Sequence, residues 1–145
     1  MAVRFFDQGV SSNLKNKRKL SGYLQSLIEK KNKIVHHVDL TYVFCNDEYL
    51  LGINQEFLDH NTFTDIITFD LSETSQKLVG EIYISVDRVK ENAEKFRVKY
   101  ELELHRVIFH GALHLCGFKD KTKQDKERMS NEEDACLKEY FQEGK

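Results

Sequence analysis

The chain has 145 residues, of which 40% are hydrophobic and 32% are charged. This balance is typical of one globular domain with an apolar core, so we expect a single domain over residues 1–145. Lys and Arg total 22 and Asp and Glu total 24, which gives a formal net charge of −2. Any polyanionic partner must therefore bind a local positive patch, because the chain has no overall positive field.

Cysteine content and hydropathy bear on the environment of the protein. The three Cys are widely spaced and odd in number, which does not fit a disulfide framework and favours a reducing compartment. The first ten residues lack the long apolar run of a secretory signal, and no apolar stretch of 18 residues occurs. We therefore expect a cytoplasmic protein with no membrane-spanning segment.

Hydrophobic periodicity predicts the secondary structure. In chain order, we expect a strand at residues 2–6, a helix within residues 13–33, a strand at residues 38–44, a helix at residues 46–58, strands at residues 65–71 and 79–85, and helices at residues 86–96, 100–116 and 125–141. Asn46 suits the N-cap of its helix, and Gly117 the end of the helix before it. This order predicts an α+β fold, with a small mixed β-sheet of about four strands covered by several helices.

The last predicted helix, residues 125–141, is amphipathic in an irregular way. We expect it to pack against the body through Met129, Ala135, Leu137 and Phe141.

The most informative segment is HGALHLCGFKD, residues 110–120. On a helix, His110 and His114 lie one turn apart on one face, where two imidazoles can hold one metal ion. Gly117 tolerates a left-handed backbone, so the chain can turn back and bring Asp120 to the same point. Two nitrogens and one carboxylate leave a fourth position open, as in catalytic zinc sites. The alternative is a helix with two hydrogen-bonded histidines and an ordinary C-terminal glycine.

Cys116 is a competing zinc ligand in this segment. It follows His114 by two residues, about 200° around a helix, and therefore faces away from the histidines. We expect a buried structural cysteine there.

The HxxxHxxGxxD pattern resembles the zinc-peptidase motif HExxHxxGxxH. In those peptidases the Glu after the first His is the general base. Gly111 occupies that position here and has no side chain to accept a proton. The sequence therefore disfavours a metallopeptidase.

Three blocks of the chain resemble the YbeY family of bacterial rRNA-maturation endoribonucleases. HGALHLCGFKD is similar to the family pattern HGxLHLxGyDH, and INQEFLDHNTFTDIITF (residues 53–69) to LNxxYRxxDxPTDVLSF. GEIYIS (residues 80–85) matches the block Gly-Asp/Glu-Ile-x-Ile-Ser. The blocks agree in order and spacing, and the resemblance covers residues 40–137.

The resemblance implies a zincin-like fold with the metal site on the long helix. It also implies a metal-dependent endoribonuclease that cleaves single-stranded RNA in 16S rRNA 3′-end maturation and ribosome quality control. The implied partners are rRNA and the ribosomal subunit, with one Zn²⁺ and no small-molecule cofactor. His110, His114 and Asp120 are the implied metal ligands, with Asp120 in place of the usual third His. Its negative charge is expected to make the metal a weaker Lewis acid.

The chain departs from the family pattern beside the predicted site. Leu58 stands where the family usually has Arg, and Phe63 where it has Pro. His60 is either a substitute donor for a phosphate or a solvent-exposed loop residue. Asp65 either braces its neighbours or accepts a proton, so the sequence identifies no catalytic residue. The missing Arg keeps a second function open, a ribosome-associated module that holds its metal for structure.

Positive charge is concentrated in two segments. Residues 12–33 hold seven Lys or Arg against one Glu, and four basic residues lie near the predicted site, namely Arg106, Lys119, Lys121 and Lys123. Both groups are either RNA-binding patches or ordinary solvated faces. We expect Tyr42, Phe69 and Tyr83 in the core, because they lie within predicted strands.

Overall fold

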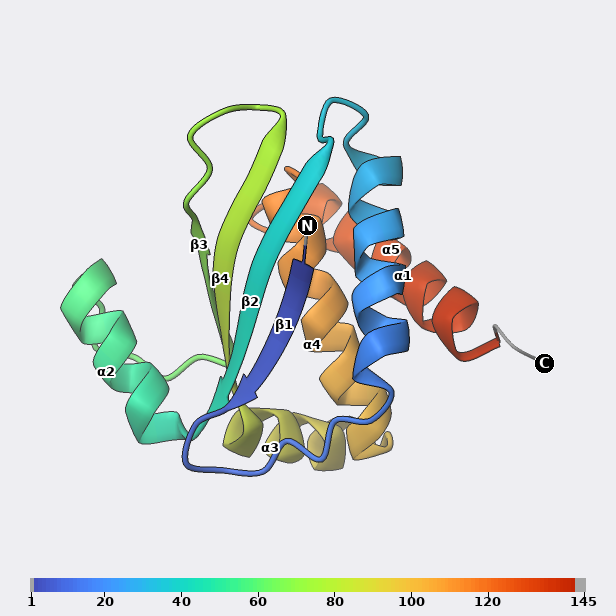
Figure 1. Cartoon of the computed structure of the whole chain (residues 1–145). Helices are drawn as coiled ribbons and strands as arrows, with labels where there is room; N and C mark the ends of the chain where they lie inside the picture. Colours follow the sequence, from blue (N-terminus) through green and yellow to red (C-terminus); the bar gives the residue numbers. More distant parts are fainter. Residues whose placement is uncertain (1, 143–145) are drawn as a thin grey trace.

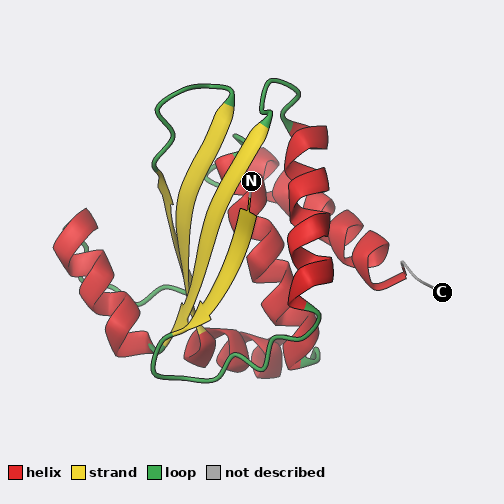
Figure 2. Ribbon diagram, viewed as in Figure 1, coloured by secondary structure: helices red, strands yellow, loops and turns green. Residues whose placement is uncertain are grey.

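A computed structural model describes residues 2–142, in which four strands and five helices are found (Figures 1 and 2). The strands are β1 (Ala2–Asp7), β2 (His37–Cys45), β3 (Ile66–Asp70) and β4 (Lys77–Ser85), and the helices are α1 (Lys17–Lys31), α2 (Asp47–Leu58), α3 (Val86–Phe96), α4 (Tyr100–Leu115) and α5 (Lys123–Gln142). The sheet order is β1-β2-β4-β3, with β2 parallel to β1 and β4 and with β3 antiparallel to β4. The α+β prediction with a small mixed sheet is confirmed.

The two faces of the sheet are covered by different helices (Figure 1). Because side chains alternate along a strand, neighbours in β4 point to opposite layers. Ile82 and Ile84 belong to the main core with α1 and α4, whereas Tyr83 packs with Leu50 and Ile67 beneath α2. Within the described residues, no helix combines the length and the apolar character needed to cross a bilayer.

Helix α4 is fixed on the sheet by a hydrogen bond and by one close approach. The buried Tyr42 hydroxyl donates to the Ile108 carbonyl at 2.8 Å. One turn further, Gly111 lies so close to β3 and β4 that a Cβ there would meet Ile82 at 3.0 Å and Ile66 at 3.1 Å. The helix is therefore held in depth and rotation near the predicted metal ligands.

The termini of the first and last helices differ from the sequence prediction. Asn13 and Asn16 both have left-handed backbones, with φ of 55° and 56°, so α1 begins only at Lys17. The last helix begins at Lys123, two residues before the predicted start. Asn46 caps α2 as expected, because its side chain accepts a hydrogen bond from the Tyr49 N–H.

The face that α5 buries also differs from the prediction. Its buried residues are Met129, Glu133, Cys136 and Tyr140, which form one stripe at steps of four, three and four. Ala135 is exposed, so its assignment to the core was wrong: six residues after Met129, it lies about 240° away around the helix. The predicted Leu137 and Phe141 are partly buried at the edges of this stripe, and a charged residue, Glu133, is on its buried side.

Gly80 in β4 provides a test of the packing beneath α4. A Cβ at Gly80 would lie 2.9 Å from the Phe69 carbonyl oxygen and 3.0 Å from Leu115. Gly80→Ala is expected to lower the free energy of unfolding by about 1–3 kcal/mol, because the backbone of β3 must move. The matched control is Gly52→Ala in the open middle of α2, where nothing lies within 4 Å. That change is expected to stabilise by about 0.5–1 kcal/mol, so urea denaturation showing equal effects would contradict the packing.

Candidate active site

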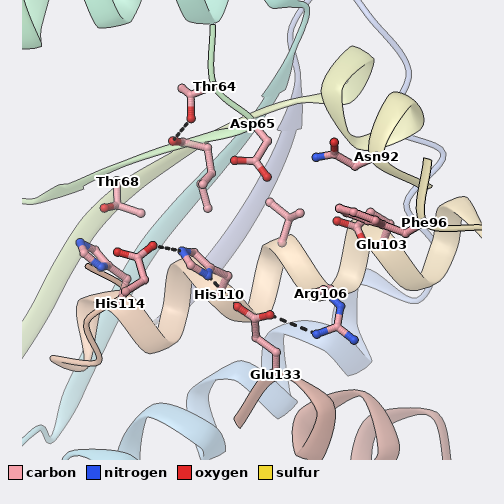
Figure 3. Close-up of a pocket in the computed structure, with 13 residues that line it drawn as sticks. Thr64, Asp65, Thr68, Asn92, Phe96, Glu103, Arg106, His110, His114 and Glu133 are labelled. Carbon is pink, nitrogen blue, oxygen red and sulfur yellow. Dashed lines mark hydrogen bonds and ion pairs between the residues drawn. The ribbon is translucent and has the colours of Figure 1, made fainter. Parts of the chain in front are cut away.

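A cavity of about 490 Å³ lies along one face of α4 (Figure 3). Its walls come from the segment before β3 and from β3 itself, from α3, from the loop after α4 and from α5. All three predicted metal ligands line it: His110, His114 and Asp120. The sequence therefore located the cavity through the residues of one helix and the loop that follows.

The turn after α4 brings Asp120 back to the helix, as the sequence predicted. Gly117 has φ of 103°, a conformation that side chains rarely adopt, and its N–H bonds to the His114 carbonyl at 3.0 Å. The Asp120 Oδ2 then lies 3.4 Å from the Nε2 of His110. His114 lies one turn further along the same face of α4 and borders the same cavity.

Glu133 of α5 holds the other nitrogen of His110. The His110 Nδ1 lies 2.6 Å from Glu133 Oε2, and Arg106 donates to Glu133 Oε1 at 3.1 Å. A carboxylate that accepts from a guanidinium is ionised, so the Nδ1 of His110 carries the proton and donates it to Glu133. In the neutral ring, the Nε2 atom then carries a lone pair that points toward Asp120 and the cavity.

The charges around His110 favour a cation at this point. Burial alone would lower the pKa of His110, but the hydrogen bond to Glu133 and the negative charges of Glu133, Asp120 and Asp65 together raise it. The same charges that favour a proton on the imidazole favour a metal ion at its Nε2.

The donor set fits a zinc site of the open kind. Two histidines and one carboxylate are the appropriate ligands, and a carboxylate behind the first histidine is the usual support for a zinc-bound imidazole. Within residues 2–142, no three His, Cys, Asp or Glu side chains have the mutual geometry of a preformed metal site. The ligand assignment of His110, His114 and Asp120 therefore stays a prediction.

Two further carboxylates line the cavity without a hydrogen-bond partner among the other described side chains. These are Asp65, before β3, and Glu103, on α4 (Figure 3). Burial raises the pKa of Asp65, although the positive charge of His110 partly offsets it. Burial likewise raises the pKa of Glu103, partly offset by Arg106. Asp65 therefore lines the cavity and has no hydrogen bond to another side chain in the described part of the chain.

Cys116 and the nearby lysines lie away from this cavity. Cys116 lines a separate cavity with Lys31 and Lys119, and burial, only partly offset by Lys31, raises its thiol pKa to about 11. Lys121 and Lys123 do not line the site cavity either. Arg106 does, but its charge is paired with Glu133 and with Asp134.

A second, smaller cavity of about 370 Å³ adjoins the first one. The two share Thr64, Ile66 and Thr68 along β3, and the smaller one is lined by Leu58 and His60. Leu58, which stands where the family usually has Arg, therefore borders the site. Its side chain is apolar.

The residues that line the site and that the sequence analysis missed include Asn92, Phe96, Glu103 and Glu133. Glu133 left a readable signal, because it lies four residues after Met129 on the apolar stripe of α5. A charged residue on a buried face needs a partner, and a basic group opposite it is the expected one.

Comparison with known proteins identifies the family. A family model described as Endoribonuclease YbeY matches residues 6–141. This chain belongs to the YbeY family. A protein of Cytophaga hutchinsonii named Endoribonuclease YbeY is 46% identical over 135 residues, covering 93% of each chain. A protein of the same name from Porphyromonas gingivalis is 44% identical over 135 residues, covering 93% of this chain and 87% of its own.

A solved structure shares the fold of this YbeY-family chain. The solution structure of TM1509 from Thermotoga maritima superposes with a TM-score of 0.61 at 25% sequence identity. The match covers 97% of this chain and 90% of the other. The sequence-based recognition of the family and of its fold is thereby confirmed.

The pairing of Glu133 predicts a specific stability difference. Glu133→Gln is expected to lower the free energy of unfolding of the metal-free protein by about 1–3 kcal/mol, because Arg106 and His110 lose a buried ionised acceptor. The control is Asp134→Asn, which removes the exposed partner of the same Arg106 and is expected to cost less than about 1 kcal/mol. Guanidinium denaturation with chelator present measures both, and equal losses would contradict the buried network.

Proposed function

We propose that this chain is a zinc-dependent endoribonuclease that cleaves single-stranded RNA in 16S rRNA 3′-end maturation and ribosome quality control. Its partners would be rRNA and the ribosomal subunit, and no organic cofactor would take part. The observation that supports the proposal most is the cavity that His110, His114 and Asp120 all line, with Glu133 behind His110. The endoribonuclease names of the family and its relatives support the substrate class.

The protein's own residues would each have a defined part in this reaction. His110, His114 and Asp120 would hold one zinc ion, and Glu133 would keep the Nδ1 proton of His110 in place. Zinc bound there would supply Lewis-acid chemistry on a phosphoryl oxygen or on a water molecule. Asp65 would accept the proton from the attacking nucleophile, since it lines the cavity and burial raises the pKa of its carboxyl group.

Gly111 explains why the base is on another segment. A Cβ at residue 111 would lie 3.0 Å from Ile82 and 3.1 Å from Ile66, so a glutamate there would require these side chains to shift. The metallopeptidase arrangement, with the base next to the first histidine, is therefore disfavoured on this helix. Asp65, on the opposite wall of the cavity, is free of this restriction.

Cleavage of RNA should depend on the metal and on its ligands. The zinc-loaded protein should cleave an unstructured RNA, chelation should abolish cleavage, and added zinc should restore it. His114→Ala should remove both the zinc and the activity, because one of two imidazole ligands is lost. Gel analysis of end-labelled RNA and elemental analysis of the same samples measure the two effects.

Asp65→Asn is the companion variant in that experiment. It should keep the zinc but lose most of the cleavage, since only the proton acceptor is removed. If zinc-loaded wild type and His114→Ala are equally inert on RNA, the endoribonuclease proposal fails. The ribosome-associated binding module, which the apolar Leu58 favours, would then take its place.

The third ligand has a separate test that does not use activity. Asp120→Ala should lower zinc occupancy much more than Cys116→Ser, because the Cys116 thiol lies in another cavity. Asp120→His should retain zinc if the loop geometry admits the usual ligand of the family. Competition with a chromophoric chelator measures the affinities, and equal losses for Asp120→Ala and Cys116→Ser would reassign the coordination.

A further inference from the structure

One exposed aromatic ring stands at the edge of the site cavity. Of the large hydrophobic side chains that are exposed in the described residues, only Phe96 lines this cavity, and it is 57% exposed. Figure 3 shows it beside Asn92 and Glu103, at the far end of the cavity from His114. Exposure of a phenyl ring is unfavourable, so a ring that is exposed at a polar cavity is a candidate binding element.

The ring is presented by a helix end with a fixed backbone. Phe96 is the last residue of α3, and Arg97 follows with a left-handed backbone at φ of 58°. The Val98 N–H closes the turn on the Ala93 carbonyl at 3.0 Å. Asn92 is one turn before Phe96 on the same face of α3, so both side chains form part of one wall of the cavity. The ring is therefore preorganised for contact.

Basic residues flank this ring in the chain. Lys95, Arg97 and Lys99 are all exposed, and within residues 2–142 none of them forms a salt bridge. The ammonium of Lys95 lies 5.8 Å from the centre of the Phe96 ring. Arg106, which lines the cavity, is paired with two carboxylates. Lys95, Arg97 and Lys99 do not line the cavity themselves, but they flank Phe96, which does.

The interior of the cavity carries the opposite charge. Asp65, Glu103, Asp120 and Glu133 all line it, so a polyanion is repelled unless cations at the rim and at the metal ligands attract it. Single-stranded nucleic acid matches such a rim, because its bases stack on exposed aromatic rings while its phosphates bind flanking cations.

We propose that Phe96 is a base-stacking platform for single-stranded RNA, and that Lys95, Arg97 and Lys99 bind the phosphates beside the stacked base. This basic aromatic rim, defined as residues 95–99, deepens the proposed endoribonuclease function and rests on it. The lining residues of α4 extend from Glu103 to His114, about 16 Å along the helix axis. Phe96 lies near the Glu103 end, so it would hold a base away from the scissile bond and align the strand.

The test separates stacking from charge. The probe is a fluorescein-labelled oligouridine, and its Kd is measured by anisotropy at several salt concentrations, with chelated and with zinc-loaded protein. Phe96→Ala should raise Kd about tenfold with an unchanged salt slope, because a stacked base is lost but no phosphate contact. Phe96→Leu, which keeps apolar volume, should show most of that loss. The double change Lys95→Gln and Lys99→Gln should reduce the slope of log K against log salt by about 1.4.

Matched controls come from other faces of the molecule. Phe6→Ala removes a ring of similar exposure, 53%, on the opposite edge strand of the sheet. Lys30→Gln with Lys33→Gln removes two exposed lysines, one in α1 and one just after it. Both controls should bind like the wild type. An abasic oligomer should bind wild type and Phe96→Ala equally, since it has phosphates but no bases to stack.

The outcomes distinguish this proposal from the proposed function. If wild type cleaves and binds RNA but Phe96→Ala and Phe6→Ala have the same Kd, the platform is overturned and the endoribonuclease stands. If the lysines of α1 carry the salt dependence instead, the basic part of the rim is overturned. If zinc-loaded wild type neither binds nor cleaves the RNA, the proposed function fails and the platform fails with it.

Discussion

The site depends on how closely α4 can approach the sheet. The approach is possible because residue 111 has no side chain: a Cβ there would lie only 3.0 Å from Ile82 and 3.1 Å from Ile66. The hydroxyl of Tyr42 completes the contact by donating to the Ile108 carbonyl. With its depth and rotation fixed in this way, α4 turns the face that carries His110 and His114 toward the cavity. The absence of a side chain at 111 therefore has two consequences: it seats the helix, and it moves any general base to another segment.

The electrostatics of the cavity follow from a surplus of carboxylates. Asp65, Glu103, Asp120 and Glu133 face one histidine pair and one arginine, and burial raises the pKa of both Asp65 and Glu103. Glu133 is compensated by Arg106 and His110, whereas Asp65 and Glu103 have no such side-chain partners within residues 2–142. An arrangement of this kind is unfavourable for folding alone, and a bound cation would relieve it. The chain therefore combines a site that attracts cations with a substrate that is an anion, so the positive groups must lie where the substrate enters.

The sequence was sufficient for what local periodicity and turn chemistry determine. It predicted every strand and helix, the cap by Asn46, the turn at Gly117 and the return of Asp120 to the helix. It failed where tertiary contacts decide. The start of α1 was misplaced because Asn13 and Asn16 adopt left-handed backbones. Ala135 was assigned to the buried face of α5, which in fact carries Glu133 together with apolar residues. Glu133 and Phe96 come from α5 and α3, and their meeting with α4 depends on helix packing that the spacing of residues along the chain does not determine.

If Phe96 stacks a base, as proposed, the ring would favour single strands over duplexes. A base in a duplex is stacked and paired on both sides, so contact with Phe96 would first require unstacking at a cost of a few kcal/mol. An unpaired base meets the ring without that cost, while its phosphates meet Lys95, Arg97 and Lys99 at the same turn. The neighbouring cavity with Leu58 cannot supply such a phosphate contact through a guanidinium, so under the proposal the α3–α4 turn would attract the backbone instead. The net charge of −2 therefore does not determine whether a polyanion binds. Binding depends on where a few unpaired cations lie relative to the carboxylates.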